Sequence, residues 1–106
     1  MLKISSHTIT TLNVTQKLLG GLKTAAASRE AAAWVTVQNN GAAAIWIKSG
    51  TANSTADNTT DGIQVAAGAS VTFAAQAGGA NAYDLDLMYV FCTAGANAYV
   101  VARLTH

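Results

Sequence analysis

The stretch that decides the fold is Trp34-Val35-Thr36-Val37-Gln38-Asn39-Asn40-Gly41-Ala42-Ala43-Ala44-Ile45-Trp46-Ile47-Lys48. Its two halves are rich in β-branched and aromatic residues, which favour strands. Asn40-Gly41 lies between them and is a strong signal for a hairpin, because a type I′ turn requires positive φ at both central residues. We therefore predict an antiparallel hairpin in which Val35 lies opposite Trp46.

Both faces of this predicted hairpin are apolar. Trp34 and Ile47 share one face, and Val35 and Trp46 share the other. An antiparallel sheet with one wet face alternates apolar and polar side chains, but this hairpin has no polar side. We therefore expect both of its faces to be covered.

The rest of the chain repeats this pattern of short β-rich runs separated by turns that contain glycine or asparagine. The other predicted strands are one over 8–15, a second hairpin over 62–73 that turns at Ala67-Gly68, one over 85–92 and one over 98–104. Loops are predicted over 24–33, 49–61 and 74–83. The first of these is rich in alanine but too short for a stable isolated helix.

These elements predict an all-β protein of seven or eight short strands. The expected architecture is a small antiparallel β-sandwich or barrel, with a jelly roll as the leading topology. A chain of 106 residues fits one domain. Within it, we expect residues 1–30 to form an N-terminal strand followed by a loop, or an arm that reaches a neighbour, and residues 31–106 to form the sandwich core.

Charge is scarce in this chain. Six basic and five acidic residues make up 10% of the sequence, against about 25% in typical soluble domains. There is no basic patch of the kind that nucleic-acid binding needs, and no apolar run longer than six residues that could cross a membrane. Low charge favours a protein that spends its life bound to a partner or to itself. The alternative is a monomer with a neutral polar surface.

The sequence contains few groups that could carry chemistry. His7 and His106 lie at opposite ends of the chain without metal-ligating neighbours, and we expect both to be solvated. Asp84 and Asp86 could imitate a catalytic pair, but a turn-capping role fits their position better. Cys92 lies in an apolar run, where a buried, inert thiol is expected. We predict a non-enzymatic protein with no metal site and no cofactor, made in a reducing cytoplasm.

The aromatic residues are the best candidates for contacts with a partner. Aromatic side chains often form core or interface anchors, and our candidates for self-association or partner contact are Trp34, Trp46, Tyr89 and Tyr99. Stacking of such rings on a sugar is the alternative. The basic residues also concentrate before residue 49 and the acidic ones after it. This order would suit head-to-tail contacts in a ring, although chance could produce it.

Several segments together resemble the small all-β virion proteins of tailed bacteriophages. The similar segments are 34–41, 45–47, 62–73, 87–90 and 94–101. The resemblance extends over about residues 34–104 and consists of strands and turns rather than a catalytic signature. It implies a structural protein of the virion, most simply a capsid cement (decoration) protein. Such a protein forms a symmetric homo-oligomer, commonly a trimer, and bridges subunits of the major capsid protein.

Two other functions remain open at this stage. The first is a tail, fibre or baseplate module that contacts the host surface. The second is a carbohydrate-binding module that uses its exposed aromatic rings. Neither requires a catalytic residue or a cofactor.

Overall fold

The computed structural model describes residues 1–20, 31–49, 62–74, 83–85 and 88–105. These residues form nine strands and no α-helix. The strands are β1 (Leu2–Ile9), β2 (Gln16–Lys17), β3 (Ala31–Asn39), β4 (Ile45–Ser49), β5 (Ile63–Val65), β6 (Ser70–Ala74), β7 (Tyr83–Asp84), β8 (Met88–Cys92) and β9 (Asn97–Thr105).

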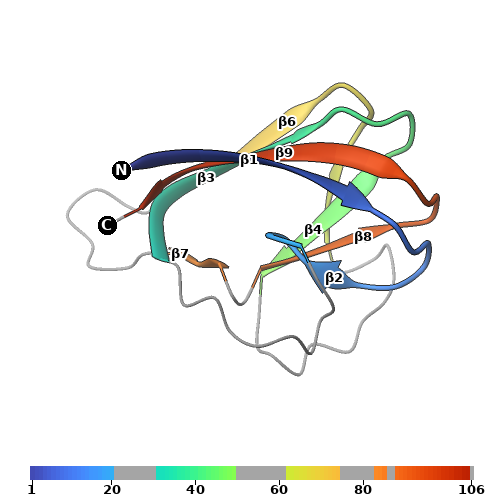
Figure 1. Ribbon diagram of the computed structural model, residues 1–106, viewed down its shortest axis with the longest axis horizontal. Helices are drawn as coiled ribbons and strands as arrows, with labels where there is room; N and C mark the ends of the chain where they lie inside the picture. The colour runs from blue at the N-terminus through green and yellow to red at the C-terminus, as the bar shows by residue number, and fades with distance from the viewer. Residues whose placement is uncertain (21–30, 50–61, 75–82, 86–87, 106) are drawn as a thin grey trace.

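The strands form two antiparallel sheets that pack as a sandwich (Figure 1). Sheet A has the order β1-β9-β3-β6, with the short β7 also paired to β3, and sheet B has the order β2-β8-β4-β5. Strands from the two halves of the chain pair in nested fashion: β1 with β9, β2 with β8, β3 with β6 and β4 with β5. The all-β sandwich predicted from the sequence is confirmed.

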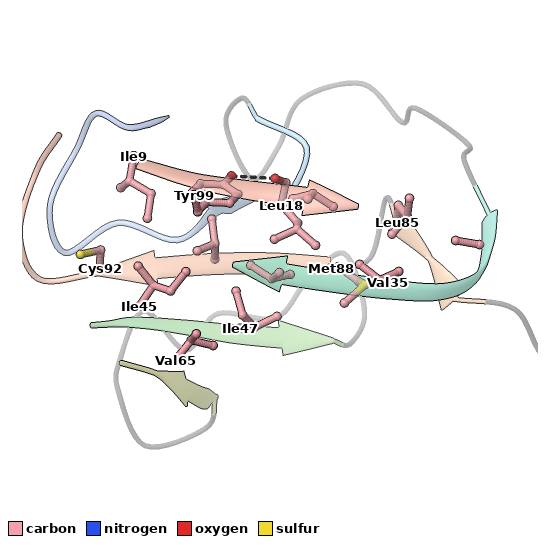
Figure 2. Packing of buried hydrophobic residues seen from close by; sticks show 14 residues of the cluster. Ile9, Leu18, Val35, Ile45, Ile47, Val65, Leu85, Met88, Cys92 and Tyr99 are labelled. Carbon is pink, nitrogen blue, oxygen red and sulfur yellow. Dashed lines mark hydrogen bonds between the residues drawn. The ribbon is translucent and has the colours of Figure 1, made fainter. Parts of the chain in front are cut away.

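The core lies between the two sheets, as Figure 2 shows. Alternate residues of β9 are buried, from Asn97 to Thr105, so one face of this strand points into the sandwich. β3 contributes Val35 and Val37, and β4 contributes Ile45 and Ile47 from the opposite layer. The apolar character of both halves of the 34–48 stretch therefore has a simple cause, because each half belongs to a different layer of the same core.

The predicted hairpin around Asn40-Gly41 is wrong. β3 pairs with β6, β7 and β9 in sheet A, while β4 pairs with β5 and β8 in sheet B. Val35 accordingly lies opposite Arg103 and not opposite Trp46. Neither Asn40 nor Gly41 has positive φ, so the type I′ turn does not form. The chain instead crosses from one sheet to the other over residues 40–44.

Two buried asparagines explain why the chain crosses here. The Nδ2 of Asn39 donates to the carbonyls of Ala43 (2.8 Å) and Val65 (2.9 Å), and its Oδ1 accepts from the backbone N–H of Gly41 (3.0 Å). Asn97, at the start of β9, donates to the same Oδ1 and accepts from the N–H of Ala43, both at 3.0 Å. These hydrogen bonds satisfy the backbone of the crossing, which could not otherwise be buried cheaply.

The second predicted hairpin, over 62–73, is also wrong as a pairing. The turn is present, since Gly68 has a φ of +80° and the N–H of Ala69 donates to the carbonyl of Ala66. However, β5 and β6 on its two sides join different sheets. The N–H of Gly68 and the carbonyl of Ala69 bond to Asn39 instead, so this turn packs beside the crossing described above.

The N-terminal prediction places the first strand too late. The strand is β1, at residues 2–9, where 8–15 was predicted. A turn follows it, with Asn13 at a φ of 58° and its N–H bonded to the carbonyl of Cys92. β1 and β2 both pair with strands of the same chain, so residues 2–9 and 16–17 belong to the sandwich and not to an arm.

The predictions for the remaining segments have mixed outcomes. The last strand is confirmed and extends over 97–105. The strand predicted over 85–92 is confirmed only from Met88 onward, and the loop predicted over 24–33 is wrong at 31–33, which begin β3. Most of the other two predicted loops, together with residues 24–30, Asp86 and His106, lie outside the described residues.

Candidate interaction surface

The outer face that strands β1, β9, β3 and β6 form on sheet A is an uncharged surface of the molecule. Because odd-numbered residues of β1 and β9 point into the sandwich, even-numbered residues point outward. The register places them in rows with the outward residues of β3 and β6: Leu2, Leu104, Trp34 and Ala74; then Ile4, Ala102, Thr36 and Thr72; then Ser6, Val100, Gln38 and Ser70. No side chain in these three rows carries a charge.

One end of this face is strongly apolar. We call Leu2, Ile4, Trp34 and Leu104 the apolar end. Leu2 is 56% exposed, Ile4 66% and Leu104 37%, and Trp34 is half-buried beside Leu104. Fully covering an aliphatic side chain stabilises by about 1.5–3 kcal/mol. The apolar end is therefore a patch whose coverage by a partner is favourable, and such patches on a soluble protein commonly mark interaction sites.

The middle of the face is polar but neutral. The hydroxyls of Thr36 and Thr72 hydrogen-bond each other across β3 and β6 at 2.8 Å. Gln38 and Ser70 lie opposite each other in the next exposed pair. The threonine hydroxyls satisfy each other, and covering these uncharged rows carries no desolvation cost for a charge. A protein partner can therefore cover this face at low electrostatic cost.

A polar cluster on the inward side of the β1–β9 ladder connects β1, the strand at the edge of this face, to β9. The Nε2 of His7 lies 2.7 Å from the Oγ of Ser5, and the same Oγ accepts a hydrogen bond from Nη1 of Arg103 at 2.9 Å. The ring of His7 stacks on Tyr99, with the ring centroids 5.3 Å apart. Burial, and secondly the charge of Arg103, lower the pKa of His7 below its usual value. His7 was expected to be solvated, and that expectation is wrong.

The distance between Ser5 and His7 is one at which a base could activate a serine, but the arrangement lacks other parts of such a site. In the described part of the chain the Nδ1 of His7 has no hydrogen-bond partner to orient it, and the Ser5 oxygen is already engaged by Arg103. A working serine–histidine pair needs a third group to hold the base. We interpret the cluster as a connection between strands.

Tyr99 completes this connection to the rest of the core. Its hydroxyl donates a 2.6 Å hydrogen bond to the carbonyl of Leu18, next to β2 (Figure 2). Burial raises the pKa of this hydroxyl well above its usual range, so it remains a donor at any physiological pH. The bond links β9 of sheet A to the residue that follows β2 of sheet B.

The four predicted contact residues do not lie together. Trp34 lies on the outer face of sheet A. Trp46 is half-buried on the outward side of sheet B, where its ring and that of Phe91 form a T-shaped pair with centroids 6.3 Å apart. Tyr89 and Tyr99 are 0% and 2% exposed. Tyr99 lies in the core between the sheets, whereas Tyr89 is buried on the side of sheet B that carries Trp46. Trp34 and Trp46 are therefore the two candidates with exposed surface for a partner.

Leu2, Ile4 and Leu104 were missed by the sequence analysis. A signal for two of them was present, because the apolar Leu2 and Ile4 alternate with the polar Lys3 and Ser5 at the start of β1. It was overlooked because the β-branched run beginning at Thr8 looked more like a strand. Leu104 lies in a nearly continuous apolar run, in which alternation cannot distinguish the outward side.

No metal-binding group of His, Cys, Asp and Glu occurs among the described residues. Cys92 is buried, as predicted, and its thiol donates to the carbonyl of Ala44 at 3.3 Å. The described part of the chain contains no helix suited to spanning a membrane. No protein-family model matches the chain, and neither a curated protein nor a solved structure matches it significantly.

Proposed function

We propose that this chain is a non-enzymatic structural protein of a bacteriophage virion, which stabilises the head as a capsid cement protein. It would dock on the major capsid protein through the outer face of sheet A. The virion assignment is supported by the resemblance of residues 34–104 to phage virion proteins. The docking role is supported by the properties of the face itself.

The observation that carries the proposal is the absence of charge from three complete rows of sheet A. In a protein with few charges, their exclusion from one broad face leaves that face poorly protected from association. The apolar end adds Leu2, Ile4 and Leu104, all exposed. A surface of this kind resembles the depletion of charge seen at the centre of protein interfaces.

A cement protein needs no reaction chemistry. If it binds the mature shell and not its precursor or its dissociated subunits, mass action stabilises the shell by an amount set by that difference in affinity. Covering the exposed parts of the apolar end contributes a few kcal/mol, which is less than association costs. Tight binding therefore requires contact over the whole face, or several linked copies bound at once.

We also propose that the sandwich is a jelly roll. The support for this classification is the nested pairing of β1 to β4 with β9, β8, β6 and β5. A long hairpin rolled into two sheets has this pairing, and eight strands in two sheets are usual for a jelly roll.

The proposal is tested by removing the chain from the particle and adding it back. Particles that lack it should lose their DNA at a lower temperature, and the purified protein should restore the wild-type temperature. Leu104→Lys places a charge in the apolar end without entering the core. We expect this variant to raise the temperature of DNA loss only slightly. Gln64→Lys is the matched control, since Gln64 is exposed on β5 in sheet B. This variant should restore the wild-type temperature fully.

A different outcome would favour the alternative. Heads of unchanged heat stability, combined with loss of adsorption to the host, would reject the cement role and indicate a tail, fibre or baseplate module. Equal restoration by both lysine variants would reject sheet A as the docking face.

A further inference from the structure

Among the residues that the structure describes, nothing pairs with the outer hydrogen-bonding edge of strand β1. Met1 and Thr105 exchange two backbone hydrogen bonds, of 2.7 and 2.8 Å. Because bonded pairs alternate along an antiparallel ladder, the odd-numbered residues of β1 bond to β9. The N–H and C=O groups of Leu2, Ile4, Ser6 and Thr8 therefore point away from β9, and within the described residues β1 pairs with β9 alone.

This edge has little of the protection that natural edge strands normally carry. β1 is eight residues long, contains no proline and forms a regular ladder over its whole length. Its one lysine, Lys3, lies in the row that faces the other sheet and not on the outer face. Proteins usually block such edges with proline, bulges or charge, because an open edge pairs with another chain.

We propose that the edge of β1 pairs with β1 of a second copy of this chain, antiparallel about a two-fold axis at Ile4. In this register Ile4 lies opposite Ile4 of the second copy, and Leu2 lies opposite its Ser6. Three residue pairs are then hydrogen-bonded between the copies, all of them formed by groups that face the free edge. The two A sheets become one continuous sheet.

Side chains determine this register. Ile4 is the most exposed large hydrophobic side chain of β1, at 66%, and pairing it with itself joins the apolar ends of the two copies into one patch. A shift of the register toward the N-terminus would bring Lys3 opposite Lys3, and like charges directly opposite each other destabilise a sheet. With Ile4 on the axis, Lys3 lies opposite Ser5 instead. This register pairs Ile4 with Ile4 and places Lys3 opposite an uncharged residue, where the alternative has a repulsion.

The contact is isologous, because each copy contributes the same strand. It differs from the trimer that the resemblance implies, since a three-fold ring needs two different surfaces on each copy. The edge contact is small, and small interfaces are weak or transient. The biological purpose of this pairing rests on the proposed function. Two linked copies present two uncharged faces, and such a pair binds a repetitive shell more tightly than one copy does.

Cysteine cross-linking tests the register with the full chain alone. Residues in a hydrogen-bonded antiparallel pair have Cα atoms about 5.5 Å apart, within the range that a disulfide spans. Ile4→Cys should form a disulfide-linked dimer under mild oxidation. Thr8→Cys is the control, since Thr8 is exposed on the same strand but does not lie opposite Thr8 of the second copy in this register. The native Cys92 is buried and should not interfere.

Light scattering with size-exclusion chromatography tests the association itself. The mass of the wild-type chain should approach twice that of one chain as concentration rises. Ser6→Pro removes an N–H that faces the free edge and leaves the ladder to β9 intact, so it should give a folded monomer by circular dichroism. If it is unfolded, Ser6→Lys at the same position serves instead and should also be a monomer.

Several results would overturn the pairing. These are a wild-type monomer at all concentrations, a trimer, or equal cross-linking by Ile4→Cys and Thr8→Cys. These measurements use no particles. A dimer that fails to protect heads would reject the cement role alone, and a monomer that protects them would reject the β1 pairing alone.

Discussion

Replacement of Asn39 by alanine should strongly destabilise the protein. The Asn39 side chain is fully buried and makes four hydrogen bonds, to Ala43, Val65, Gly41 and Asn97. A buried hydrogen bond contributes about 1 kcal/mol on average, and each partner left unsatisfied costs more. We expect Asn39→Ala to lower the free energy of unfolding by about 4 kcal/mol, against a total of about 5–15 kcal/mol for a domain of ordinary stability.

Urea denaturation followed by tryptophan fluorescence and circular dichroism measures this loss. With a slope of about 2 kcal/mol per molar urea, the midpoint should fall by about 2 M. Asn40→Ala is the control, because Asn40 is the exposed neighbour and its substitution should change the midpoint little. If Asn39→Ala lost less than about 1 kcal/mol, the asparagine pair could not be what directs the chain between the sheets.

Three further predictions concern single residues. Tyr99→Phe removes the hydrogen bond to Leu18 and should cost about 1–2 kcal/mol in the same denaturation assay; no loss would contradict a role in joining the layers. Gly41→Ala should destabilise by more than 2 kcal/mol, on the order of an overpacked core, because its Cβ would overlap the Asn97 amide; a normal melting temperature would refute this. The depressed pKa of His7 means that the unfolded state takes up the proton first, so stability should fall as pH drops below 6.5 toward the lowered folded-state pKa. His7→Gln should reduce that fall in a pH series of melting temperatures, and an unchanged pH profile would contradict it.

The existence of the strands could be predicted from the sequence, but their partners could not. β-Branched runs identify β3, β4 and β9 because local composition reports the preference for an extended backbone. Asn40-Gly41 gave a strong local signal for a hairpin, and that signal was overridden by Asn97, a residue 58 positions from Asn39. A side chain so distant in sequence leaves no periodic trace, so reasoning from local pattern cannot place it.

The candidate surface was only partly predictable for the same reason. Trp34 stood out by its size, and the shortage of charge was visible in the composition. The uncharged face itself appears only when β1, β9, β3 and β6 are placed side by side, because its rows combine residues from both ends of the chain and its middle. Tyr89 and Tyr99 were equally conspicuous in the sequence but are buried in the folded chain.

The measurement that tests the central proposal most directly is the number of copies of this chain per purified particle, relative to the major capsid protein. Quantitative mass spectrometry of intact particles and of separated heads and tails provides that ratio. The cement role predicts that the chain remains with the heads in a fixed, near-stoichiometric proportion to the capsid protein. Absence from the heads, or recovery in a few copies with the tails, would contradict it.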